Sequence, residues 1–419
     1  MKVANLFKGD KAIWAVFLFL CLISIVEVFS ASSTLTYKSQ NFMWPLIYHS
    51  GTILVGVFVA IIILNIPCRY FKLITPVMLF ITYATLLGVL IWGQSINGAN
   101  RVIQLPGFTF QPSELAKGTM VLATAQILSA MQRPDTKGAD PKAMKYILVV
   151  SVPAVLLILI ENLSTGILLF GVIYIMMFIG RVPLLQMGKL TGVLVLLAGL
   201  FLGMVFGVGS LDKEGQELER AELATEQVVV KKNDTASRSF FDSVTHRFWT
   251  WKNRLTKRSK TKNVSPQDYD IKNNYQVAHA NFAVASSNVI GKGPGNSVER
   301  DYLPQAFSDF IFAIIIEEMG LAGAIAVVLL YVILLFRVGR IAGRCENNFP
   351  AFLIMGLALL LVCQAVINMM VATDFGIVTG QPLPLVSKGG TSTIVNCAYI
   401  GAILSVSRSA KKTLTTSTI

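Results

Sequence analysis

The chain has 419 residues, of which 54% are hydrophobic and 14% are charged, and its mean hydropathy is +0.63. Soluble domains are roughly 45–50% apolar and about 25% charged, so this composition excludes a water-soluble protein and indicates an integral membrane protein. A formal net charge of +13 would suggest a nucleic-acid partner for a soluble protein. Here it reflects membrane topology and contact with anionic headgroups, and we expect no nucleic-acid partner.

Apolar runs close to the roughly 20 residues that cross a bilayer as a helix recur along the chain. They predict an all-α polytopic membrane protein with ten transmembrane helices. The runs lie at residues 12–30, 47–66, 73–93, 115–131, 145–160, 163–180, 190–208, 309–336, 350–372 and 388–408. The first run lacks the small-residue cleavage site of a signal peptide, so we interpret it as a span.

Lysine and arginine gather at every second connection, as the positive-inside rule requires of an even number of spans. This pattern predicts that both termini lie in the cytoplasm. The connection at 209–308 is also basic, but long loops cross the membrane largely regardless of charge. We therefore expect a single membrane domain over residues 1–419, with a large extracytoplasmic loop at 209–308 between helices seven and eight.

Two external segments differ from short connections. Residues 94–113 mix glycine, proline and aromatic residues, which predicts a loop that dips toward the membrane where protein shields its backbone. Within the large loop, residues 237–260 interleave aromatic and basic residues, as in an interfacial helix or alternatively a partner-binding or solvated loop. Residues 273–297 return to a small-residue apolar pattern and are expected to pack against the protein.

The stretch FQPSELAKG at 110–118 has the features of a helix start, with proline in the first turn and Ser113 as a cap. Glu114 and Lys117 lie three residues apart on one helix face and can pair. The pair either neutralises itself at the entrance of a span or lines a cavity, since ionisable groups at membrane depth rarely face lipid. Gln111 joins this motif as a candidate ligand. Arg101, just upstream, lacks an obvious local partner and could bind an anionic headgroup.

The stretch PLVSKGGTSTIVN at 384–396 places Gly389 and Gly390 at the entrance of the last span. Together with Ser387, Lys388 and Ser392 they offer backbone amides, hydroxyls and a positive charge at a helix N-terminus, which suits an anion such as phosphate. Close helix packing at the paired glycines is the alternative interpretation.

The stretch QAFSDFIFAIIIEEMG at 305–320 begins an apolar run with Asp309. This acid is suited either to capping the helix or to catalysis. An unbroken helix over 309–336 would be roughly 42 Å long and would place Glu317 and Glu318 roughly 12–14 Å from its start. Since exposure of charge to lipid is costly, both glutamates are expected to point into the bundle.

Three stretches, in chain order, resemble the signature regions of the SEDS family (shape, elongation, division and sporulation). They are GANRVIQLPGFTFQPSELAKG, GKGPGNSVERDYLPQAFSDFIFAIIIEEMG and PLPLVSKGGTSTIVN. The GNS followed by YLP is closer to the cell-division branch, FtsW, than to the elongation branch, RodA. The predicted topology is also that of the family, and the likeness covers about residues 90–408.

The resemblance implies a peptidoglycan glycosyltransferase that polymerises lipid II at the outer face of the bacterial cytoplasmic membrane. Its implied partners are a class B penicillin-binding protein and other division proteins at the septum. Asp309 matches the essential acid of the family, which implies a general base, with polyprenyl pyrophosphate as the leaving group. Arg101, Lys117, Lys388 or a divalent cation (Mg or Mn) would meet the pyrophosphate charge, although no ligand cluster in the sequence identifies a metal. Gln276 and Glu318 complete the candidate substrate-binding residues.

The sequence departs from the family pattern at three places. Phe307 stands where most members have a histidine, so a histidine relay is not required here. Lys388 stands where members commonly have a tyrosine, and ENLSTG at 161–166 replaces EPDxGT. Lys388 and Glu161 therefore take no role from the family motif.

Two other functions compete with the polymerase reading. A lipid II flippase would also need a polar cavity, but it predicts important charges at both membrane faces, whereas the unusual residues gather at the outer ends of spans. A scaffold would act through its long loop and would leave Glu317 and Glu318 without a role. An elongation-type polymerase is the alternative within the family.

Overall fold

The computed structural model describes residues 8–32, 43–96, 99–105, 108–133, 138–208, 275–303 and 306–416. The chain separates into two compact units. One unit comprises Met1–Pro183 with Lys272–Ile419, and the other comprises Leu184–Ile271. Within the second unit, the described part is the apolar helix α8 (Leu184–Val208).

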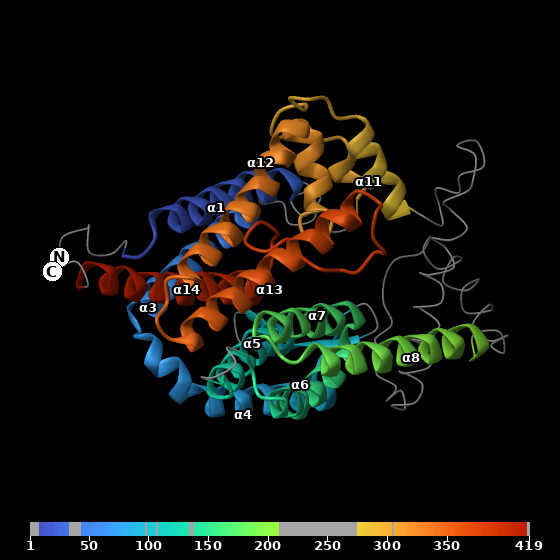
Figure 1. Ribbon diagram of the computed structural model, residues 1–419. Coiled ribbons are helices and arrows are strands. Elements are labelled where there is room, and N and C mark those ends of the chain that lie inside the picture. Colours follow the sequence, from blue (N-terminus) through green and yellow to red (C-terminus); the bar gives the residue numbers. More distant parts are fainter. Residues whose placement is uncertain are drawn as a thin grey trace. The chain divides into compact units, whose positions relative to one another are not determined.

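The described part of the first unit consists mainly of long helices (Figure 1). Their bounds are α1 (Lys11–Ala31), α3 (Trp44–Asn65), α4 (Cys68–Trp92), α5 (Pro112–Ala130), α6 (Lys142–Glu161), α7 (Leu163–Ile179), α12 (Ile311–Ala342), α13 (Asn348–Ala372) and α14 (Gly390–Thr416). Two short elements, α11 (Tyr275–Ala285) and the 3₁₀ helix η2 (Glu299–Asp301), precede α12.

Each of the ten predicted spans overlaps a helix. Among the described residues, eight helices are long and apolar enough to cross a membrane: α1, α3, α4, α6, α8, α12, α13 and α14. The helix α7 is apolar but has only 17 residues, and α5 contains the charged residues Glu114 and Lys117. The polytopic α-helical class is therefore confirmed, and the count of ten stays a prediction.

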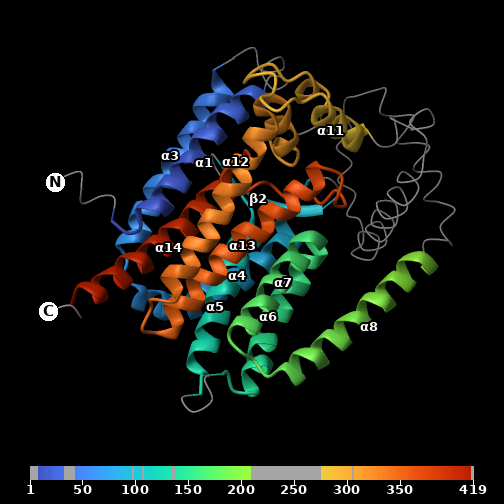
Figure 2. The same ribbon diagram turned by 45° about the horizontal axis from the view of Figure 1, so that its top comes forward.

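Close helix packing depends on small residues at the contacts. The helix α14 packs along α3, and α13 packs against α5, α7 and α12 (Figure 2). A Cβ atom at Gly56 would lie 2.7 Å from Cys397 Sγ, and one at Gly401 would lie 2.6 Å from the Ala60 carbonyl oxygen. The missing side chains allow α3 and α14 to approach closely.

The segment 94–113, predicted as an irregular loop, instead contains a three-stranded antiparallel sheet in the order β1-β2-β3. The strands are β1 (Gln94–Ile96), β2 (Ala99–Leu105) and β3 (Phe108–Phe110). Backbone polar groups near a membrane must be paired, and strand pairing satisfies them as a helix would. The last strand leads directly into α5 and so positions Gln111.

The prediction of an unbroken helix from Asp309 is wrong. The helix α12 begins at Ile311, and Gly320 interrupts it with non-helical angles, φ 69° and ψ −171°. A Cβ atom at Gly320 would lie 2.4 Å from the backbone nitrogen of Gly291. Glycine is required here because this backbone region is essentially closed to other residues and because another backbone approaches it closely.

The residues after α11 dock onto this break, as expected for a segment that returns to the protein. Backbone N–H groups of Lys292 and Gly293 donate to the carbonyls of Glu317 and Glu318 (3.0 and 2.8 Å). On the other side of the break, the N–H groups of Leu321 and Ala322 donate to the carbonyls of Asn288 and Val289 (3.1 and 3.0 Å). The loop thus supplies the partners that helix ends lack. The predicted interfacial segment at 237–260 lies outside the described residues.

Candidate functional site

Asp309 lies in the short turn that precedes α12. The carbonyl oxygens of Phe307, Ser308 and Asp309 each accept a hydrogen bond from α13 or from the loop before α14. The donors, in the same order, are the backbone N–H of Lys388 (2.9 Å), the hydroxyl of Ser387 (2.6 Å) and the side-chain amide of Asn368 (2.8 Å). Because the carbonyl groups of three successive residues are hydrogen-bonded, the backbone of the turn is held in place.

The Asp309 carboxylate is half-buried, and the Ser308 hydroxyl donates to its Oδ1 at 2.9 Å. Its Oδ2 faces Gly380, where an added Cβ atom would be 3.5 Å away. The N-cap residue of α12 is Phe310, and no side chain caps this helix. The N-cap position belongs to Phe310, so the structure contradicts the interpretation of Asp309 as the cap of α12.

The predicted pairing of Glu114 and Lys117 is confirmed. Lys117 Nζ lies 2.8 Å from Glu114 Oε1, and the side chains are 0% and 3% exposed. Ser392 donates to the other carboxylate oxygen (3.1 Å), and the Tyr399 hydroxyl donates to the Glu114 carbonyl (2.7 Å). The pair is thus enclosed by protein, and the Lys117 ammonium is directed to internal partners.

The prediction that Ser113 caps α5 is wrong. The N-cap residue is Gln111, no side chain caps the helix, and Pro112 takes the first helical position. Ser113 instead accepts a hydrogen bond from the Gln111 side chain (3.1 Å), while the Gln111 backbone N–H donates to Thr391 Oγ1 (3.3 Å). Because Pro112 occupies the position directly after the cap, Ser113 already lies inside the helix.

Two α13 residues that the sequence motifs did not identify connect these parts. Gln364 accepts from Lys117 Nζ (2.7 Å) and donates to the Pro382 carbonyl (3.0 Å). Asn368 donates to the carbonyls of both Asp309 and Gln381 (2.8 Å each). The sequence did offer a signal for them, because the two amide side chains lie four residues apart in an apolar span. Polar residues at membrane depth usually face the bundle interior.

The Lys388 ammonium lies 5.0 Å from the ring centroid of Phe307, within range of a cation–π contact. The side chain is half-buried, and this burial lowers the pKa of Lys388 below its ordinary value. The helix α14 begins at Gly390, as predicted, and Gly389 directly precedes it. The loop before α14 therefore carries a positive charge and leads into a helix N-terminus, and its backbone is hydrogen-bonded to the turn that contains Asp309.

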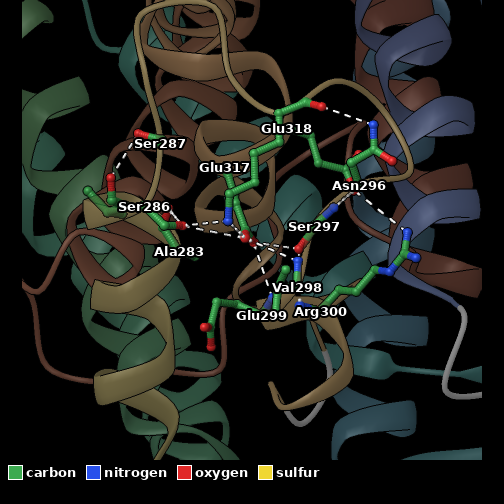
Figure 3. A network of polar contacts seen from close by, with 12 residues as sticks. Ala283, Ser286, Ser287, Asn296, Ser297, Val298, Glu299, Arg300, Glu317 and Glu318 are labelled. Carbon is green, nitrogen blue, oxygen red and sulfur yellow. Dashed lines mark hydrogen bonds and ion pairs between the residues drawn. The ribbon is translucent and has the colours of Figure 1, made fainter.

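Glu317 and Glu318 form the centre of a separate polar network (Figure 3). Both are completely buried, as predicted. Glu317 binds Lys292 Nζ (2.6 Å) and Ser297 Oγ (2.5 Å), and it also accepts from backbone N–H groups at 298 and 299. Glu318 accepts from Ser30 of α1 and from the backbone N–H groups at 295 and 297. The two acids therefore hold the loop that precedes the site.

The remaining candidates are placed as follows. The two carboxylate oxygens of Glu318 accept hydrogen bonds from its own chain, which fits buried support better than substrate contact. Gln276 is exposed near the start of α11. Arg101 belongs to β2, and its side chain is not among those the structure describes. Within the described ranges, no three His, Cys, Asp or Glu residues gather as a metal site would require, so we assign no step to a metal ion.

Comparison with known proteins identifies the family of the chain. The family model for cell cycle proteins of the FtsW, RodA and SpoVE type matches residues 10–211 and 241–412. A Halomonas elongata protein named "Probable peptidoglycan glycosyltransferase FtsW" is 29% identical over 92% of this chain and 87% of that protein. A Coxiella burnetii protein of the same name is 27% identical over 94% and 95%.

Solved structures share the fold. The Thermus thermophilus rod shape determining protein RodA superposes with a TM-score of 0.61 at 21% identity, over 96% of this chain and 98% of that chain. A chain from a peptidoglycan synthase complex that coordinates polymerization and crosslinking gives a TM-score of 0.67 at 21% identity, over 96% and 99%. The family model spans most of the sequence, and the resemblance seen in the motifs is thus confirmed. The chain belongs to the SEDS family of cell cycle proteins, and the two curated relatives named above carry the FtsW name.

Proposed function

We propose that this protein is a peptidoglycan glycosyltransferase that polymerises lipid II at the outer face of the cytoplasmic membrane, with Asp309 as the general base. The observation that carries the proposal is the half-buried Asp309 carboxylate on a turn held by successive hydrogen bonds, with the Lys388 ammonium in the adjoining loop. A positioned carboxylate and a positive charge on an adjoining loop suit a reaction that removes a proton and releases an anion.

In the proposed reaction, the Asp309 carboxylate takes the proton of the acceptor sugar hydroxyl as its oxygen attacks the donor anomeric carbon. The bond from that carbon to the pyrophosphate oxygen breaks, polyprenyl pyrophosphate leaves, and the configuration at carbon inverts. General base catalysis contributes typically about 10²–10⁴-fold. Lys388 and the backbone amides at the start of α14 would stabilise the leaving pyrophosphate.

The test is polymerisation of labelled lipid II by purified protein with and without its class B penicillin-binding protein. Wild type should make glycan chains, and Asp309→Asn should make none, since an amide cannot accept the proton. Asp140→Asn is the matched control, because Asp140 is a half-buried acid in the connection before α6 and pairs with Arg133 (2.6 Å). Equal polymer from Asp309→Asn would refute the assigned base, and lipid II translocation without polymer would support a flippase.

The proposal includes a role at the division septum with other division proteins, and both termini in the cytoplasm. It draws on the FtsW name of the curated relatives and on the basic connections of the sequence. A fluorescent fusion should form a ring at mid-cell. Dispersed patches along the cell wall would instead indicate the elongation role.

A further inference from the structure

We infer that Gln364 and Asn368 of α13 are positioning residues that couple the Glu114–Lys117 pair to Asp309. The inference rests on the proposed role of Asp309. The ion pair on α5 and the acid before α12 are far apart in sequence, and the pair is enclosed by protein. The groups that contact the pair are therefore those through which it can affect the position of Asp309.

Gln364 is the first of these groups. It is 1% exposed, and its side-chain oxygen accepts from Lys117 Nζ at 2.7 Å. Its side-chain nitrogen donates to the Pro382 carbonyl at 3.0 Å. Pro382 lies in the loop between α13 and α14, which continues to Ser387 and Lys388. The amide oxygen of Gln364 thus binds the buried Lys117 ammonium, and its amide nitrogen binds the loop whose residues also bind the Asp309 turn.

Asn368 lies one helical turn further along the same face of α13. Its side-chain nitrogen donates at 2.8 Å both to the Asp309 carbonyl and to the Gln381 carbonyl. The opposite orientation of the amide would aim its oxygen at two carbonyl oxygens, which fixes the assignment. The Asn368 side chain therefore bridges the Asp309 turn and the loop between α13 and α14, and its two hydrogen bonds fix how far apart the two backbone carbonyls lie.

The simpler interpretation is that each amide only satisfies a buried polar group. That interpretation predicts an effect on stability alone. A positioning role predicts a fall in kcat with little change in KM, because the base would be misplaced in the transition state while the substrate is still bound. The two interpretations are separated by substitutions that keep the side-chain shape and replace the donor N–H group with a carboxylate oxygen, with a control that introduces the same charge at another buried-carbonyl contact.

The experiment uses the full chain with its transpeptidase partner and measures kcat and KM for lipid II together with thermal unfolding. Gln364→Glu keeps the acceptor for Lys117 and loses the donor to Pro382. Asn368→Asp loses both donated bonds. The matched control is Gln132→Glu, because Gln132 also donates to a backbone carbonyl, that of Gly180, at 3.0 Å. Its position just after α5, in the connection to α6, is at the opposite end of that helix from Glu114.

We expect kcat to fall by about 10-fold for Gln364→Glu and about 100-fold for Asn368→Asp, as misplacement by about 1 Å can cause. KM should stay within about two-fold, and Gln132→Glu should match wild type. Wild-type kcat in Gln364→Glu, with Asp309→Asn inactive, would overturn the inference but not the proposed base. Activity in Asp309→Asn would overturn the base itself. If Asn368→Asp does not fold, Gln364→Glu alone decides.

Discussion

The Ser387 hydroxyl donates a hydrogen bond of 2.6 Å to the carbonyl oxygen of Ser308, one residue before Asp309. The same hydroxyl accepts a bond of 2.7 Å from the backbone N–H of Leu383. Ser387 is buried, so water cannot replace either bond without rearrangement. One side chain of the loop before α14 therefore determines the position of the residue that precedes the proposed base.

Ser387→Ala should lower kcat by about 10-fold, because a small shift of the base is enough to slow a reaction of this kind. The unpaired N–H and carbonyl groups should also cost about 1–3 kcal/mol of stability each. Steady-state polymerisation and thermal unfolding measure the two effects. Ser405→Ala is the control, since Ser405 donates to the Ile66 carbonyl (2.5 Å) near the opposite end of α14. Equal kcat in both variants would contradict the prediction.

Gly320→Ala should destabilise the protein and disturb the docked loop. The backbone conformation costs a non-glycine residue about 1–3 kcal/mol, and the added methyl would lie 2.4 Å from the Gly291 nitrogen. Thermal unfolding and protease sensitivity of the loop after α11 measure the loss. Gly339→Ala on the same helix is the control, because a Cβ atom there meets nothing within 4 Å. A protein that tolerates both changes equally would show that the break is not required.

The activity should depend on Lys388 at alkaline pH. Burial lowers the pKa of Lys388, so its ammonium loses its proton at a lower pH than an ordinary lysine. Since the charged form would bind the pyrophosphate, kcat/KM should fall as pH rises through this lowered pKa. Lys388→Arg should move that fall to higher pH, because arginine stays protonated. Superimposable pH profiles for the two proteins would exclude Lys388 from the alkaline limb.

Asp10 should stabilise the start of α1 without affecting catalysis. Its carboxylate accepts from the N–H groups of Ala12 and Ile13 (2.9 and 3.3 Å) and pairs with Arg337 (2.9 Å). Asp10→Ala should lower stability by about 1–2 kcal/mol, as loss of a helix cap does. Thermal unfolding at neutral pH measures the change, with exposed Glu346→Gln as the control.

This contribution should also depend on pH. Burial alone would raise the pKa of Asp10. The hydrogen bond and charge of Arg337, together with the backbone N–H groups of Ala12 and Ile13, outweigh burial and keep the pKa below its usual value. The stabilisation is therefore present above the ordinary pKa of aspartate and is lost as pH falls through the lowered value. The difference between wild type and Asp10→Ala should shrink on acidification; a constant difference would contradict this assignment.

The sequence by itself determined the properties that depend on local composition and spacing. Hydropathy located the helices, the three-residue spacing predicted the Glu114–Lys117 pair, and the position of Gly390 predicted the start of α14. The burial of Glu317 and Glu318 also followed from the cost of exposing charge to lipid. Each of these predictions needs only neighbouring residues or the membrane.

Only the tertiary structure decided which residues that are far apart in the sequence contact one another. Lys117 and Gln364 are 247 positions apart, and the contact exists because α5 packs against α13. The break at Gly320 likewise depends on a loop that supplies its hydrogen bonds, since helix propensity alone favoured continuation. Hydrogen bonds reach only about 3 Å, so they depend on how helices pack, and a one-dimensional pattern does not contain that information.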